Sequence, residues 1–132
     1  MEFDLQEGSQ GSIYVVSVRG DVDICTAPQL DACIQRGISA GNQEIALDLE
    51  GCSYLDSEGI KVLIKALRSL SGQGRVLICG ARGAVRRVLE ISGLETLFEI
   101  LPSVEDLLKR SALLWVVFAG YLVTLSGCSC MD

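Results

Sequence analysis

The sequence predicts an α/β domain in which about four helices pack on a central, mixed but mostly parallel β-sheet. Short segments rich in β-branched and apolar residues alternate with amphipathic segments of helical length. Strands that alternate with helices pair in parallel through right-handed crossovers. Hydrophobic residues make up 49% of the 132 residues, charged residues make up 21%, and there are two prolines. This composition and length indicate one globular domain and exclude a disordered chain.

The first three elements are placed by periodicity and by turn residues. Residues 13–18 predict a strand that ends at an Arg-Gly-Asp turn. A helix is expected over residues 27–39, because apolar residues recur at helical spacing and Thr26 can cap the N-terminus, with Gln29 at the capping-box position. Residues 44–49 read Glu-Ile-Ala-Leu-Asp-Leu, which predicts a buried strand that stops at Glu50-Gly51.

The remaining elements continue the alternation. A second helix follows the Asp-Ser-Glu-Gly segment and ends near Gly72, where a Gly-Gln-Gly turn leads into a strand over residues 75–79. A third helix reaches Ile91 and stops at Ser92-Gly93, and residues 97–101 predict a last short strand. A fourth helix opens at Ser103 with an acidic first turn, which the helix dipole favours.

Charge and composition exclude several classes of function. Eleven Lys and Arg against seventeen Asp and Glu give a net charge of -6, which is the wrong sign for a surface that binds nucleic acid. The chain contains no histidine, so Ser-His-Asp and Cys-His catalysis, His-ligated zinc and His phosphotransfer are excluded within it. A Walker lysine motif and a complete glycine-rich nucleotide fingerprint are also absent from the sequence. We therefore expect no catalytic residues, no cofactor and no nucleic-acid partner.

The six cysteines do not predict a disulfide framework, because no signal peptide precedes them. Four of them stand singly in apolar segments and are expected to be reduced core residues of a cytoplasmic protein: Cys25, Cys33, Cys52 and Cys79. Cys128 and Cys130 form a Cys-Ser-Cys segment near the C-terminus, where the neighbourhood lacks further metal ligands.

Three turn aspartates, Asp21, Asp23 and Asp56, would be the candidates for a magnesium site if the fold brought them together. Acidic turn residues are usually solvated, and their spacing in the sequence does not establish that they converge. We predict no metal site.

The segment Asp56-Ser57-Glu58-Gly59 is the most informative one, because it places a hydroxyl where a strand and loop meet a helix N-terminus. One interpretation is structural: Asp56 or Ser57 accepts from free backbone N–H groups, and Gly59 permits a tight entry. A nucleophile elbow also puts a serine at such a turn, but no histidine can activate it. In the third interpretation Ser57 is the substrate of a kinase, and a phosphate would add about -1.5 to -2 charge beside two carboxylates.

Three segments, in the expected order, resemble the STAS domain family and, within it, the bacterial anti-sigma factor antagonists. Gly20-Asp21-Val22-Asp23, followed by Thr26-Ala27, resembles the family's Gly-Glu-Leu-Asp turn and helix start. Residues 47–60 resemble the strand, loop and phosphorylation segment, and Ser92-Gly93-Leu94 resembles the closing stretch. The likeness covers about residues 13–109.

The resemblance implies a cytoplasmic binding module whose unphosphorylated form captures an anti-sigma factor and so frees a sigma factor for transcription. The anti-sigma factor of such a pair is typically an ATP-dependent serine kinase, and a PP2C-type phosphatase is the further partner expected. Ser57 falls on the family's phosphorylated serine, Asp56 on the preceding aspartate and Asp23 on the turn aspartate. Glu58 departs from the family, which commonly has Ser or Thr there.

The partner surface is predicted at the N-terminus of the second helix and the turn beside it. Its expected residues are Asp23, Thr26, Asp56, Ser57, Glu58, Gly59, Ile60 and Lys61. The alternative function, from another class, is a STAS accessory subunit of a membrane lipid transport complex, and the apolar C-terminal tail is the feature in its favour.

The domain is expected over residues 1–110 and the tail over residues 111–132. Residues 112–125 are fourteen residues without charge. As a helix they would extend about 21 Å, short of the roughly 30 Å hydrocarbon core of a bilayer, so we do not expect a membrane span. We expect an additional apolar helix that covers exposed surface of the domain. A homodimer through the tail is the second interpretation, and a membrane-surface anchor ranks after it.

Overall fold

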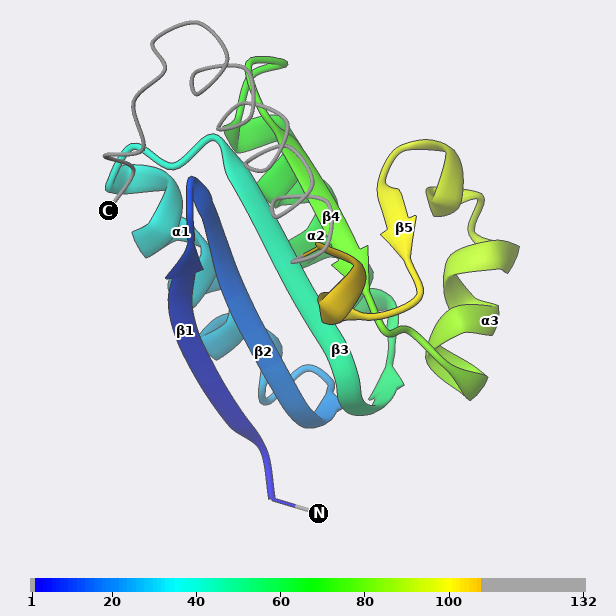
Figure 1. Cartoon of the computed structure of the whole chain (residues 1–132). Coiled ribbons are helices and arrows are strands. Elements are labelled where there is room, and N and C mark those ends of the chain that lie inside the picture. The colour runs from blue at the N-terminus through cyan, green and yellow to red at the C-terminus, as the bar shows by residue number, and fades with distance from the viewer. Residues whose placement is uncertain (1, 108–132) are drawn as a thin grey trace, which may run out of the picture.

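The computed structural model describes residues 2–107. Its elements are β1 (Asp4–Gln10), β2 (Ile13–Val22), α1 (Ala27–Ser39), β3 (Glu44–Leu55), α2 (Ser57–Ser69), β4 (Arg75–Cys79), α3 (Gly83–Ile91), a short 3-10 helix η1 (Leu94–Thr96) and β5 (Glu99–Leu101) (Figure 1). A further helix begins at Val104 and includes residues 104–107. The tail predicted over residues 111–132 lies outside the described residues, as do Cys128 and Cys130.

The five strands form one sheet in the order β1-β2-β3-β4-β5. The β1 strand pairs with β2 in antiparallel orientation, and the other three pairings are parallel. The α/β class and the mixed, mostly parallel sheet predicted from the sequence are therefore confirmed.

Each face of the sheet buries its own set of side chains. On one face, residues of β2 and β3 pack with Leu30 and Ile34 of α1, Leu63 of α2, and Val85 and Leu89 of α3. The opposite face buries a smaller cluster that includes Leu77 and Leu107, the latter from the last described helix. Figure 1 shows α1 and α2 behind the sheet and the start of the last helix in front of it. The sheet is thus a layer between helices.

The strands β2 and β3 run further than the sequence pattern indicates. The predicted ends at residues 18 and 49 become Val22 and Leu55 in the structure. Over this extension β3 pairs only with β2, because its pairing with β4 ends at Asp48. The register shifts twice, and Gly20 has a φ of +99°, which is a backbone conformation that favours glycine. The two strands therefore extend beyond the end of β4.

Burial corrects one prediction about the cysteines. Cys33, Cys52 and Cys79 are buried free thiols, but Cys25 is exposed. Burial raises the pKa of Cys33 and of Cys79 to about 11, so both thiols stay protonated at neutral pH. Cys25 is exposed because it lies in the turn before α1, and the apolar pattern of its neighbours does not continue into the core.

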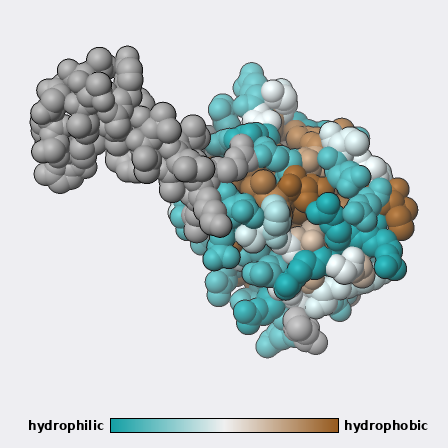
Figure 2. All heavy atoms as spheres, turned by 45° about the vertical axis from the view of Figure 1, so that its right-hand side comes forward, coloured by the Kyte–Doolittle hydropathy of each residue, from teal (hydrophilic) through white to brown (hydrophobic). Residues whose placement is uncertain are grey.

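The surface of the described residues carries a few large apolar side chains. Figure 2 views the side of α3 and β5 and shows hydrophobic surface among mainly hydrophilic side chains. Ile91 at the end of α3 is 79% exposed, and Leu97 before β5 is 55% exposed. None of the helices within residues 2–107 has the length and apolar character needed to cross a membrane.

The two faces of the sheet lead to a test of stability. Leu107 is 2% exposed, and Leu107→Ala should lower the free energy of unfolding by about 2 to 5 kcal/mol, because it leaves a cavity on the second face. Leu97→Ala is the matched control, with an expected change within about 0.5 kcal/mol. Urea denaturation followed by circular dichroism measures both. Equal losses in the two variants would mean that Leu107 does not hold the last helix on the sheet.

Candidate functional site

The N-terminus of α2 is fixed by Asp56, the residue between β3 and the helix. Its Oδ1 accepts hydrogen bonds from the backbone N–H groups of Glu58, at 2.9 Å, and Gly59, at 3.3 Å. Its own N–H donates to the carbonyl oxygen of Val22 at 3.2 Å, which joins the helix start to the end of β2. The predicted cap is therefore Asp56, and its side chain leaves the hydroxyl of Ser57 unused in capping.

Ser57 is the first residue of α2 and is exposed. Within residues 2–107 its hydroxyl has no hydrogen-bond partner. The flanking Asp56 and Glu58 are half-buried. The hydroxyl is thus accessible to another protein, is flanked in the sequence by two carboxylates and lies at the positive end of the α2 dipole.

Asp23 organises the turn between β2 and α1. Its Oδ1 accepts from the backbone N–H groups of Cys25 at 2.9 Å and Thr26 at 3.1 Å, and its carbonyl oxygen accepts from Ala27 at 2.8 Å. The Thr26 hydroxyl instead donates to the carbonyl of Asp21 at 2.8 Å and accepts from the N–H of Asp23 at 2.9 Å.

The capping box predicted with Thr26 and Gln29 is therefore wrong. Thr26 occupies the N-cap position of α1, but its side chain makes no cap hydrogen bond. Its hydroxyl is engaged by the turn backbone, and the carboxylate of Asp23 takes over the N–H groups that precede the helix.

Gly59 lets α2 approach the sheet closely. A Cβ atom on Gly59 would lie 2.3 Å from Cδ1 of Leu55 and 3.0 Å from Cγ1 of Val22. Both neighbours are core residues at the ends of β3 and β2. Gly59 is buried and has no side chain, so it offers no contact to a partner. Its role is to let α2 pack close to the sheet, which positions Ser57.

A shallow groove of about 310 Å³ runs between α1 and α2 next to Ser57. The turn and α1 line one side of it, and α2 lines the other. Its lining residues are Ile24, Ala27, Pro28, Asp31, Glu58, Lys61, Val62 and Lys65. The predicted turn and the predicted helix start therefore converge on one surface, although they are about thirty residues apart in the sequence.

Apolar and charged groups share this groove. Ile24 is 71% exposed and places an apolar side chain beside the charged groups of the groove. Lys61 Nζ lies 3.1 Å from Glu58 Oε2, and Lys65 Nζ lies 2.8 Å from Asp31 Oδ2, which links α2 to α1 across the groove. Sequence reasoning missed Ile24, Pro28 and Asp31. An apolar residue inside a polar turn was the available signal for Ile24.

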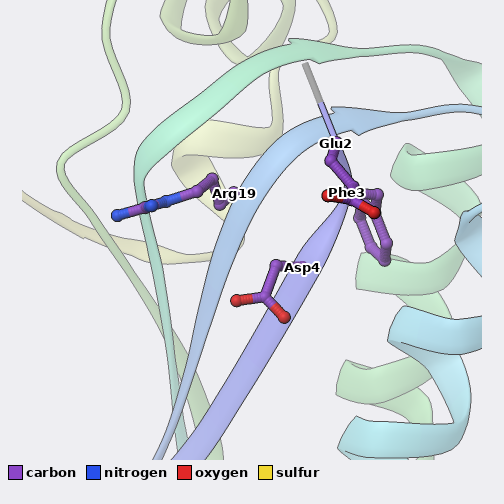
Figure 3. Close-up of a pocket in the computed structure, with 4 residues that line it drawn as sticks. All are labelled: Glu2, Phe3, Asp4 and Arg19. Atoms are coloured by element: carbon purple, nitrogen blue, oxygen red, sulfur yellow. The ribbon is translucent and has the colours of Figure 1, made fainter.

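A second hollow, of about 510 Å³, lies at the start of β1 and is lined by Glu2, Phe3, Asp4 and Arg19. Figure 3 shows Asp4 and Arg19 on one side of the sheet and Phe3 directed to the other, so these side chains do not converge. Within residues 2–107 no three Asp, Glu or Cys side chains gather as a metal site would require.

Comparison with known proteins places this arrangement in a family. The family model described as the STAS domain matches residues 6–107. The chain belongs to the STAS domain family. Members of its anti-sigma factor antagonist branch, which the matches below represent, are regulatory binding proteins and not enzymes.

Several proteins similar to this STAS domain are named anti-sigma factor antagonists. The chain is 30% identical over 101 residues to the anti-sigma-B factor antagonist of Staphylococcus aureus, covering 76% of this chain and 94% of that protein. The crystal structure of an anti-sigma factor antagonist from Mycobacterium paratuberculosis matches with a TM-score of 0.72 and 28% identity, over 83% of this chain and 93% of that one. SpoIIAA from Bacillus, in its phosphorylated form, shares the fold with a TM-score of 0.64 at 24% identity, over 83% and 99% of the two chains. The resemblance inferred from three sequence segments is thus confirmed.

The cap at α2 gives a direct test of how the STAS domain positions Ser57. Asp56→Ala should lower the free energy of unfolding by about 0.5 to 2 kcal/mol, because two N–H groups of the first turn lose their acceptor. Asp56→Asn should cost much less, since an amide oxygen can accept the same bonds. Chemical denaturation measures both variants. An Asn variant as unstable as the Ala variant would show that charge, and not capping, is what Asp56 supplies.

Proposed function

We propose that this STAS domain is a phosphorylation-controlled antagonist of an anti-sigma factor. In this proposal the unphosphorylated protein binds an anti-sigma factor that is itself a serine kinase, and the bound sigma factor is released. The single observation that carries the proposal is the exposed hydroxyl of Ser57, which has no hydrogen-bond partner among residues 2–107, on a helix start already capped by Asp56. The names of the relatives give the partner class.

Phosphorylation of Ser57 ends the complex in this proposal. The kinase transfers the γ-phosphoryl group of ATP to the Ser57 oxygen, ADP leaves, and the hydroxyl proton is lost to solvent or to the kinase. The chain needs no acid or base of its own for this step, because the partner supplies the catalysis. A PP2C-type phosphatase would restore the free hydroxyl by hydrolysis.

Charge, and not unfolding, is the means by which the phosphate acts. It adds about -1.5 to -2 charge between the carboxylates of Asp56 and Glu58. The same phosphate lies at the positive end of the α2 dipole, which stabilises negative charge. Helix α2 therefore persists, while a partner surface fitted to a neutral hydroxyl meets repulsion and uncompensated desolvation.

The partner surface proposed here joins Ser57 to the groove between α1 and α2. Of the sequence-predicted residues, Glu58 and Lys61 line the groove, while Asp23 lies in the turn beside it and Ile60 on the first turn of α2. The structure adds Ile24, an exposed apolar residue that lines the groove. An apolar side chain near the centre of such a surface contributes more binding energy than charges at the rim. Ile24 is the best candidate for that role, because its exposed side chain adjoins the groove.

Mapping of the phosphate tests the first part of the proposal. Incubation with the cognate kinase and ATP should add one phosphate at Ser57, detected by intact mass and peptide mapping. Ser57→Ala should take up no phosphate and should bind the anti-sigma factor constitutively, whereas Ser57→Asp should weaken binding. Ser53→Ala, which replaces a nearby exposed serine, is the control and should still be phosphorylated at Ser57. Phosphate on another serine would refute the assignment.

A pair of exposed isoleucines tests the second part. Ile24→Ala should weaken binding of the unphosphorylated protein to the anti-sigma factor by about tenfold or more. Ile91→Ala on α3 removes a side chain of the same size and similar exposure and should leave the affinity unchanged. Calorimetry or surface plasmon resonance measures the two affinities, and circular dichroism checks the folds. Equal affinities for both variants would place the partner elsewhere.

A further inference from the structure

We propose that phosphorylation of Ser57 makes the Lys61 ammonium group exchange its ion-pair partner, from the Glu58 carboxylate to the phosphate. This exchange changes the charge in the groove between α1 and α2. The inference rests on the proposed function and adds a residue that relays its regulation. It follows from two contacts on the first turns of α2 and from the residues that line the groove.

In the unmodified protein Lys61 is held by Glu58. The Nζ atom lies 3.1 Å from Glu58 Oε2, with the two residues three positions apart on the helix. The Lys61 side chain is 72% exposed, and that of Glu58 is 34% exposed. Such an exposed pair contributes little stability, so a stronger acceptor within reach can displace Glu58 at low cost.

A phosphate on Ser57 would be that stronger acceptor. Ser57 precedes Lys61 by four positions, so the two side chains lie on the same face of α2, and an acidic group N-terminal to a basic one at this spacing is the favoured order. The phosphate carries close to twice the charge of a carboxylate and three acceptor oxygens. At equal distance its attraction for the ammonium group is correspondingly larger.

Among the described lysines of α2, Lys61 is the one placed for this exchange. Across the groove, Lys65 is paired with Asp31 at 2.8 Å and lies two turns from Ser57. Asp56 is occupied by the two N–H groups that it caps. Lys61 is one turn from the phosphate and is held by one exposed contact.

The exchange changes the groove as well as the phosphorylated serine. Glu58 and Lys61 both line the groove, and in the unmodified protein their charges compensate each other there. Once Lys61 turns to the phosphate, Glu58 presents an unpaired carboxylate to the groove. The carboxylate at position 58 would then have a function in this chain: it holds Lys61 while Ser57 is free and adds repulsion when Ser57 is phosphorylated.

The test uses full-length protein in which phosphoserine is inserted at position 57 during translation, so it does not depend on any kinase. The second pKa of the phosphate is measured by ³¹P NMR. A cation beside the phosphate favours its dianion, so Lys61→Gln should raise this pKa by about 0.2 to 0.4 unit relative to the parent. Lys65→Gln removes the same charge from the next turn and should change it by about 0.1 unit or less. Arg68→Gln is a second control that leaves Asp31 paired.

The side-chain ammonium signal of Lys61 in ¹H–¹⁵N spectra reports the exchange itself. Glu58→Gln should shift that signal in the unmodified protein and leave it unchanged in the phosphoprotein, where Glu58 is no longer the partner. Two outcomes would overturn the inference. One is an equal change of the phosphate pKa in the Lys61 and Lys65 variants. The other is a change of the Lys61 signal by Glu58→Gln that is the same in the unmodified protein and the phosphoprotein. Failure of a kinase to modify Ser57 would count against the proposed function alone.

Discussion

The hydrogen bonds of Asp56 fix the geometry on which the proposed site depends. The backbone N–H of Asp56 binds the carbonyl of Val22 at the end of β2, and its carboxylate caps α2, so one residue ties the strand extension to the helix start. Gly59 completes the junction, because the absence of a side chain allows α2 to rest on Leu55. Ser57 is consequently presented, exposed, at a corner of the domain that these contacts hold in place.

In the proposed switch, this corner lets a small modification of Ser57 have a large effect without a change of fold. The turn at Asp23 is closed by its own hydrogen bonds, and α1 and α2 are linked by Asp31 and Lys65. A partner therefore meets a preformed surface, and little conformational entropy is lost when it binds. Phosphorylation changes the charge of that surface by about two units at its edge, and the proposed exchange of Lys61 extends the change into the groove. In the proposed switch the rest of the domain keeps the same geometry in both states.

Local pattern predicted most of the fold, and long-range pairing decided the rest. The bounds of α1 and β4 agree with the sequence, because periodicity and flanking glycines are local signals. The polar strand β1 was not predicted, since it is held by pairing with β2 and not by a buried face of its own. The continuation of β3 past Gly51 likewise depends on β2. In the site, a cap by Asp56 or Ser57 was predicted from residue type, and the structure assigns it to Asp56. The groove that Ile24 lines arises only when α1 packs beside α2.

The central claim is that phosphorylation of Ser57 changes the charge of the partner surface and leaves the fold of the domain unchanged. Amide hydrogen exchange in α2, measured on unmodified and Ser57-phosphorylated protein together with the affinity of each for the anti-sigma factor, tests it most directly. The account predicts that the affinity falls by at least about tenfold while protection along α2 is retained. Loss of protection across α2 on phosphorylation would contradict it, because the switch would then act by unfolding the helix and not by charge.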